Sequence, residues 1–158
     1  MFCGINNFAL GMLPPADYKT FFFQWAFAAT AATIVAGSIA ERCKLEAYFV
    51  YSIFLTGWVY PIITRAVWYE KGWLSAFMSP TSEGFQPFPL FGIGMVDFAG
   101  SGVVHLTGGT FALVAAIILG PRMGRFRDAA GKKLAKPNEM RGHSVSLQVL
   151  GAFILWFG

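Results

Sequence analysis

The sequence predicts an all-α protein, a polytopic bundle of helices that crosses a membrane several times. Of its 158 residues, 56% are hydrophobic and only 13% are charged, whereas a soluble domain carries roughly 25% charged residues. Several apolar stretches approach the length of about 20 residues that a helix needs to cross a bilayer core about 30 Å thick. The 17 phenylalanines and 18 glycines are typical of helices that pack closely and present apolar faces to lipid. This composition excludes an ordinary soluble globule, a disordered chain and a fibrous repeat.

The first two spans are expected at about 18–40 and 45–65. The first span follows a Pro-Pro-Ala-Asp segment and ends at the charged segment 41–44, because such charges are costly in hydrocarbon. The second span contains Pro61 near its far end, where we expect the last turns to bend.

A polar connection rich in proline leads to two further spans, expected at about 98–119 and 143–158. The fourth stretch is short of a full crossing. The chain also opens on residues typical of a loop, with no basic segment before an apolar one that would indicate a signal peptide. We therefore expect the chain to be truncated at both ends.

Basic residues predict the orientation in the membrane. The connection 120–142 contains seven of them: Arg122, Arg125, Arg127, Lys132, Lys133, Lys136 and Arg141. The positive-inside rule makes this connection cytoplasmic. Alternation then makes 41–44 cytoplasmic and makes 1–17 and 69–97 extracellular. We interpret the basic connection as a solvated, topology-setting segment, with recognition of anionic lipid or nucleic acid as the alternative, and we expect no nucleic-acid partner.

The start of the third span contains two candidate functional residues. Asp97 is placed to cap the helix by accepting hydrogen bonds from the free N–H groups of its first turn, so a structural role is our first interpretation. His105 lies about 10 Å farther along the helix, well within the hydrocarbon. An imidazole there is costly unless it faces a polar path or a partner, which makes His105 a functional candidate. A core histidine bonded to a neighbouring carbonyl is the alternative. Four glycines are expected to let helices approach at backbone distance: Gly100, Gly102, Gly108 and Gly109.

Aromatic residues provide three further candidates. Phe23 and Phe27 are four residues apart and are expected to stack on one helix face, as packing or as a gate. Counting from the outer end puts Phe27 about 13 Å deep, close to the level of His105. Trp68 follows the second span, where an indole can anchor in the membrane interface or attract a cation to its π face.

Other chemistries find no support in the residue pattern. No Ser-His-Asp or HExxH arrangement is present, and the two cysteines form neither a disulfide scaffold nor a CxxC motif. A haem protein with His105 as a ligand lacks a second deep histidine, because His143 lies at the start of a span. Cys3 and Cys43 are expected on opposite sides of the membrane, where they cannot bridge. We therefore expect no enzyme activity, no cofactor and no metal.

The segment Asp-Phe-Ala-Gly-Ser-Gly-Val-Val-His at 97–105 closely resembles the signature of the ammonium transporter family, which comprises the Amt, Mep and Rhesus proteins. Further segments that resemble its eukaryotic Amt branch extend over nearly the whole chain: 23–28, 37–42, 60–61 followed by Trp68, 120–126 and 141–158. The resemblance implies an eleven-span fold built from an inverted repeat, and a homotrimer with one pore per protomer. This chain resembles the third to fifth spans and the start of the sixth.

By motif position, the resemblance implies a role for each candidate. Trp68 becomes part of an outer ammonium-recruitment site, and Phe27, with Phe23 adjoining, becomes one ring of a gate beneath it. His105 becomes the first of two pore histidines, and Asp97 a buried residue that supports the recruitment site. The family's second pore histidine, second gate phenylalanine and recruitment-site serine belong to stretches beyond Gly158.

The resemblance also implies ammonium as substrate, with methylammonium as its analogue, and a plasma-membrane location. We hypothesise that ammonium loses its proton near the gate, because an apolar pore favours the neutral form of a titratable guest. Potassium has no removable proton and is rejected by desolvation. The alternative to transport is that the chain is a non-transporting fragment that lacks the second half of the pore.

Overall fold

The computed structural model describes residues 10–11, 13–77 and 93–157, and these form helices joined by loops. Within these ranges there is no strand, and only two isolated bridges occur, Ser75 with Met95 and Arg127 with Lys133. The expected all-α fold class is confirmed. The chain divides into two compact units, 1–120 and 121–158. The expected loop segments 1–9 and 78–92, with Cys3, lie outside the described residues.

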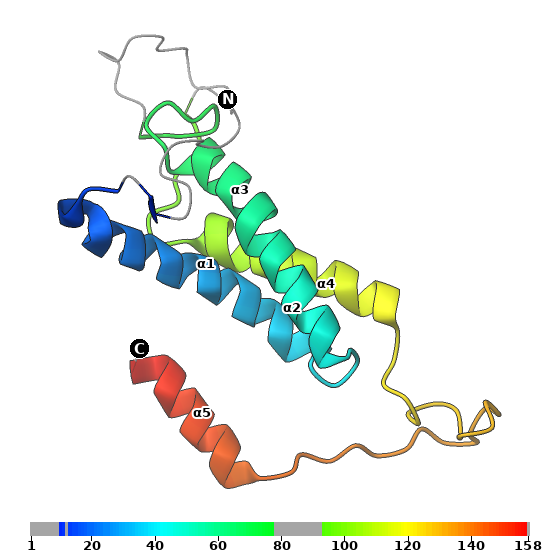
Figure 1. Cartoon of the computed structure of the whole chain (residues 1–158). Coiled ribbons are helices and arrows are strands. Elements are labelled where there is room, and N and C mark those ends of the chain that lie inside the picture. The colour runs from blue at the N-terminus through cyan, green and yellow to red at the C-terminus, as the bar shows by residue number, and fades with distance from the viewer. Residues whose placement is uncertain (1–9, 12, 78–92, 158) are drawn as a thin grey trace. The chain divides into compact units, whose positions relative to one another are not determined.

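Three helices of unit 1 are long and apolar enough to cross a membrane: Pro15–Ile39, Leu45–Val67 and Ser101–Leu119. Irregular turns divide each of them further, and Figure 1 labels their α-helical parts. The first helix consists of η2 (Pro15–Asp17) and α1 (Tyr18–Ile39), the second of α2 (Leu45–Phe54), the π-helical turn η3 (Leu55–Val59) and α3 (Tyr60–Val67), and the third of the π-helical turn η4 (Ser101–Leu106) and α4 (Thr107–Leu119).

In the second and third helices of unit 1, one bound of each differs from the expected one by two or three residues. The second helix continues to Val67, two residues past the expected end. Its irregular turn, η3, precedes Pro61 instead of following it, since proline has no N–H to donate to the turn before it. The third helix begins at Ser101, three residues later than expected, after Gly100 with a φ of 96°.

Small and branched side chains along one face of α1 form the centre of unit 1. Ala31, Val35 and Ile39 recur every four residues and are buried. Ala31 belongs to a buried cluster with residues of α3 and η4, and Val35 and Ile39 belong to a second cluster with Leu55 and Ala112. The first helix is therefore the one against which the other two pack.

Gly108 allows the closest approach between α1 and α4. A Cβ atom built at this position would lie 2.8 Å from the carbonyl oxygen of Ala31 and 3.0 Å from Cβ of Ile34. A Cβ at Gly109 would meet no atom within 4 Å. The expectation that both glycines bring helices together is confirmed for Gly108 and wrong for Gly109 among the described residues.

Hydrogen bonds at the two ends of unit 1 establish the directions of the helices. The Arg42 guanidinium, just after α1, donates to the carbonyl oxygen of Gly120, just after α4, at 3.3 Å. The Trp68 indole, at the end of α3, donates to the carbonyl oxygen of Asp97, just before η4, at 2.8 Å. The three long helices therefore alternate in direction along the chain, as the expected topology requires.

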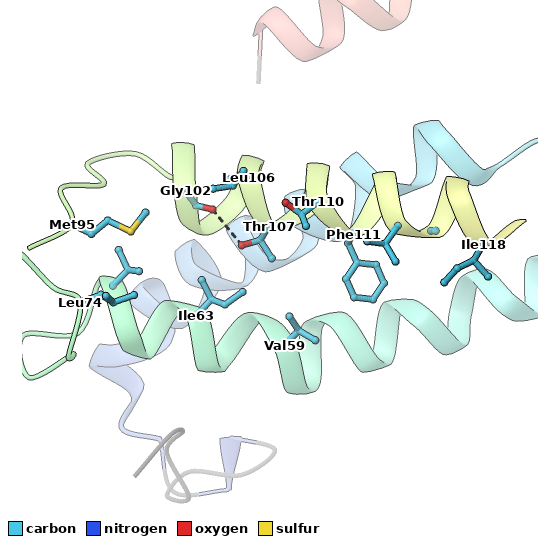
Figure 2. Close-up of a pocket in the computed structure, with 13 residues that line it drawn as sticks. Val59, Ile63, Leu74, Met95, Gly102, Leu106, Thr107, Thr110, Phe111 and Ile118 are labelled. Atoms are coloured by element: carbon cyan, nitrogen blue, oxygen red, sulfur yellow. Dashed lines mark hydrogen bonds between the residues drawn. The ribbon is translucent and has the colours of Figure 1, made fainter. Parts of the chain in front are cut away.

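Large apolar side chains remain on the outside of unit 1, among them Phe22, Ile53 and Ile118. A groove of about 610 Å³ runs between α3 and α4 and is lined almost entirely by apolar side chains, from Leu74 and Met95 at one end to Ile118 at the other (Figure 2). Such faces are typical of helices whose surroundings are lipid or further helices.

Unit 2 contains a folded loop followed by α5 (Val145–Phe157). The Ser144 hydroxyl accepts a hydrogen bond from the Leu147 N–H at 3.3 Å, which caps the start of this helix. The helix has 13 residues, fewer than the roughly 20 that a crossing needs.

Gly108→Ala is expected to destabilise the chain, and Gly109→Ala serves as its control. The added methyl group of the first variant would contact the backbone of α1, at a cost of about 1–3 kcal/mol. The same change at Gly109 meets no neighbour and gains up to about 1 kcal/mol of helix propensity. Thermal unfolding of the detergent-solubilised chain, followed by circular dichroism, measures both. Equal midpoints for the two variants would contradict the proposed close approach.

Candidate functional site

A hollow of about 310 Å³ lies where the first half of α1, the end of α3 and the segment before η4 meet. Its lining contains four of the five residues singled out in the sequence: Phe23, Phe27, Trp68 and Asp97. Gln24, Phe77 and Phe98 complete the lining. The fold therefore brings together side chains that lie up to 74 positions apart in the sequence, and His105 is not among them.

Three aromatic rings form a continuous row at the hollow. The Phe23 and Phe27 rings meet edge to face, with centroids 4.9 Å apart and planes inclined by 80°. The Phe27 ring then meets the Trp68 ring at 5.4 Å and 75°. Edge-to-face packing directs the positive edge of one ring at the negative face of the next. The expectation that Phe23 and Phe27 stack on one face of the helix is confirmed.

Asp97 is the buried polar residue beneath these rings, with only 1% of its surface exposed. Its Oδ1 accepts a hydrogen bond from the Gly100 N–H at 2.6 Å, and its Oδ2 accepts two, from Gly102 at 3.0 Å and Val103 at 2.6 Å. The expected capping of the first turn is thus present, although Asp97 lies four residues before the first helical residue. Residues 98–100 form a loop around the carboxylate because the carboxylate accepts hydrogen bonds from N–H groups of η4.

The Trp68 ring is held from two sides. Its Nε1–H donates to the carbonyl oxygen of Asp97 at 2.8 Å, and the ring packs edge to face with Phe27. The ring also lines a second hollow of about 640 Å³, shared by α1 and α3, that contains Arg65 and Gln24. Trp68 is therefore partly buried and lines both hollows. A tryptophan that only anchors a helix in the membrane interface does not require these two fixed contacts.

Two short segments close the hollow by pairing with each other and with α3. The Leu74 N–H donates to the Ala66 carbonyl at 3.0 Å, and the Met95 N–H donates to the Leu74 carbonyl at 2.7 Å. Buried Ser75 accepts a hydrogen bond from the Phe77 N–H at 3.1 Å, which positions Phe77 at the lining. The sequence analysis missed Phe77 because nothing in its local pattern distinguishes it. Gln24 was also missed, although a polar side chain inside an apolar span is a readable signal.

His105 belongs to the π-helical turn η4. Its backbone N–H donates to the Gly100 carbonyl, five residues earlier, at 2.9 Å. The Thr107 hydroxyl donates to the Gly102 carbonyl, also five residues earlier, at 3.2 Å. Short π-helical turns occur frequently at functional sites. The imidazole is exposed on unit 1 and makes no hydrogen bond to another described residue. Its expected place in a pore remains a prediction.

The hollow contains groups in its described lining that can attract a cation. Its described lining offers aromatic faces, one amide and one carboxylate, and no basic side chain. Aromatic faces attract a small cation with about 0.5–2 kcal/mol. Within the described ranges, no group of three His, Cys, Asp or Glu side chains gathers that could hold a metal ion.

Comparison with known proteins identifies the family of the chain. Residues 2–158 match the model of the Ammonium Transporter Family. The chain belongs to this family. It is 53% identical over 99% of its length to ammonium transporter 1 member 2 of Oryza sativa subsp. japonica, and 52% identical over 99% to putative ammonium transporter 1 member 5 of Arabidopsis thaliana. It is 50% identical over 99% to ammonium transporter 1 member 3 of Solanum lycopersicum.

The chain spans about a third of the length of these relatives, 30% of the first two and 32% of the third. No solved structure matches the chain at a comparable level of significance. The family membership and the three long apolar helices together indicate an integral membrane protein.

Asp97→Asn is expected to destabilise unit 1 strongly. An amide has one acceptor oxygen, and its NH₂ group would face backbone N–H donors that lose their partner, at a total cost of about 2–4 kcal/mol. Thermal unfolding in detergent measures the change.

Asp17→Asn is the matched control for this prediction. Asp17 is exposed and its side chain makes no capping bond, so the same substitution there is expected to change stability by less than about 0.5 kcal/mol. Indistinguishable unfolding midpoints for the two variants would show that the carboxylate of Asp97 does not hold the turn.

Proposed function

We propose that the protein to which this chain belongs transports ammonium across a membrane, and that the aromatic hollow is where the cation is first bound. The observation that carries the proposal is the shared lining of Phe23, Phe27, Trp68 and Asp97. The names of the relatives, two ammonium transporters and one putative ammonium transporter, suggest the substrate.

Recruitment follows from the electrostatics of the rings. The Trp68 ring is fixed by its hydrogen bond to Asp97 and by its packing against Phe27. A cation that binds to the ring where it lines the hollow therefore causes little loss of side-chain freedom. The backbone carbonyl of Asp97 lies at the edge of the indole, where it accepts the N–H, and the Asp97 carboxylate adds negative potential to the lining of the hollow. The net attraction is modest, which suits a site that must release its cation.

The Phe27 and Phe23 rings narrow the hollow and are proposed to serve as the gate. Transfer of a bare cation past apolar rings costs several kcal/mol or more. Ammonium can avoid this cost by leaving its proton behind, whereas potassium cannot. We propose that ammonia passes the gate, with or without a separately transferred proton, and that His105 lines the path beyond it, where an imidazole can bond ammonia or relay the proton.

The further properties proposed for the whole protein follow the family. They are a homotrimer with one pore per protomer, a plasma-membrane location with segment 120–142 cytoplasmic and 69–97 extracellular, and methylammonium as a transported analogue. In unit 1 alone His105 is exposed, and the apolar groove between α3 and α4 is open. This favours the alternative for the 158-residue chain by itself, namely that it does not transport, and that further helices complete the path beside His105.

Trp68→Leu is expected to raise the KM for methylammonium uptake about 2- to 30-fold, the equivalent of the 0.5–2 kcal/mol of a cation–π interaction. Uptake of radiolabelled methylammonium by the whole protein, in cells without their own ammonium uptake, measures it. Trp73→Leu is the control, since Trp73 is exposed and lines neither hollow beside Trp68. A KM unchanged by Trp68→Leu would rule out recruitment at this ring.

His105→Ala is expected to abolish methylammonium currents or to uncouple them from uptake, because the proposed path loses the group that bonds ammonia. His143→Ala, the change at the chain's other histidine, is expected to leave both unchanged. Currents recorded by voltage clamp, together with tracer uptake in the same cells, separate the two effects. Normal currents and selectivity in the His105 variant would contradict its role in the pore.

A further inference from the structure

The segment 121–138, named here the basic hairpin, is a folded element rather than an extended tether (Figure 1, yellow to orange). Its two arms pair between Arg127 and Lys133 in antiparallel fashion. The Leu134 N–H donates to the Phe126 carbonyl at 2.9 Å, and the Asp128 N–H donates to the Lys132 carbonyl at 3.0 Å. The sequence analysis treated this segment as solvated and did not anticipate its fold.

Side chains of the hairpin close its two ends. The Arg125 guanidinium donates to the Asn138 carbonyl, and the Asn138 amide donates to the Gly124 carbonyl at 2.7 Å. The Arg127 guanidinium donates to the Gly131 carbonyl at 2.9 Å. Asp128 accepts from two backbone N–H groups of the tip, at 3.0 and 2.9 Å. The carboxylate within the hairpin is therefore engaged in holding the turn.

Three lysines remain on the surface of this folded element: Lys132, Lys133 and Lys136. None of their ammonium groups forms a hydrogen bond or an ion pair with a described residue. The connection 120–142 as a whole carries seven basic and two acidic residues, whereas the rest of the chain carries five basic and six acidic ones. The hairpin thus concentrates positive charge, and its three lysine ammonium groups meet no counter-charge among the residues that the structure describes.

Two apolar side chains are exposed on the same basic hairpin. Met123 is 96% exposed, and Phe126 is 46% exposed beside the Arg125 guanidinium, 5.7 Å from the ring centre. Met123 follows Gly120, the end of the third long helix, by three residues, so it lies within about 11 Å of that end. Apolar side chains flanked by basic ones are typical of segments that lie in the headgroup region of a bilayer.

We propose that the basic hairpin binds the headgroups of anionic phospholipids in the leaflet at which the third long helix ends. The phosphates supply the counter-charge to the three lysines, and Met123 enters the headgroup layer. A membrane is favoured over a nucleic acid or a soluble acidic protein because the hairpin directly follows, in the chain, a helix long and apolar enough to cross a membrane. Basic segments next to a membrane helix are attracted to anionic lipids. The proposal goes beyond transport and does not depend on it.

Lipid selectivity of the reconstituted whole protein tests the proposal. The protein is placed in phosphatidylcholine vesicles with a trace of spin-labelled phosphatidylglycerol or spin-labelled phosphatidylcholine, and electron spin resonance measures the fraction of each label that the protein immobilises. We expect phosphatidylglycerol to associate at least threefold more strongly than phosphatidylcholine. The triple variant Lys132→Gln, Lys133→Gln and Lys136→Gln is expected to bring this ratio close to one, and 0.5 M sodium chloride is expected to reduce it.

The controls keep the outcome unambiguous. The triple variant Lys19→Gln, Lys44→Gln and Lys71→Gln changes the net charge equally, at lysines that lie apart from one another, and is expected to keep the wild-type ratio. Arginine at positions 132, 133 and 136 is expected to restore it, which excludes misfolding as the cause of the loss. A ratio near one in the wild type, or an equal loss in both glutamine variants, would overturn the proposal. Displacement of the lipid by 10 mM glycerol 3-phosphate would overturn it in favour of a site for free phosphate.

Discussion

The carboxylate of Asp97 is the group on which the arrangement of the candidate site depends. It is buried and satisfied by three backbone N–H groups from Gly100, Gly102 and Val103. Hydrogen bonds to a carboxylate contribute about 1.5–3 kcal/mol each, and the N-terminal end of a helix is the place where they are most favourable. The peptide carbonyl of the same residue accepts the Trp68 indole N–H. One residue therefore joins the start of the third helix to the end of the second, and Trp68 carries that constraint to Phe27 on the first.

Whether a contact of the site could be predicted depends on how far apart in the sequence its two residues lie. The pairing of Phe23 with Phe27 follows from their spacing of four residues on a helix, and the capping role of Asp97 follows from its place before a long apolar run. Neither depends on the rest of the fold. The bond between the Trp68 indole and the Asp97 carbonyl, by contrast, joins residues 29 positions apart. It requires a loop path between two helices that local patterns do not encode, and the same is true of Phe77 at the lining.

A second feature that local patterns do not encode is the departure of the helices from the α-helical repeat. The third helix begins with the π-helical turn η4, and a turn with an extra residue rotates every later side chain by about 100° relative to a regular helix. A face counted from Asp97 at 3.6 residues per turn is therefore displaced by the time it reaches α4. A Cβ built at Gly108 would meet α1, whereas one built at the adjacent Gly109 would meet no atom within 4 Å. Neighbouring residues of a helix point about 100° apart, so only one of the two glycines can face α1. The composition predicts that these helices exist. Which face of α4 packs against α1 also depends on the π-helical turn η4, which the composition does not predict.

Desolvation governs both the fold and the proposed transport. The Asp97 carboxylate can lie beneath the aromatic rings because N–H groups from η4 replace the water that it loses. A cation in the hollow finds no equivalent replacement among the described lining, since both carboxylate oxygens already accept hydrogen bonds and the remaining walls are mainly aromatic. The attraction of the Trp68 face, about 0.5–2 kcal/mol, is smaller than the cost of moving a bare charge past Phe27. In the proposed function, binding at the rings and passage beyond them therefore select different species, the cation at Trp68 and the neutral molecule past Phe27. This difference is what would distinguish ammonium from potassium.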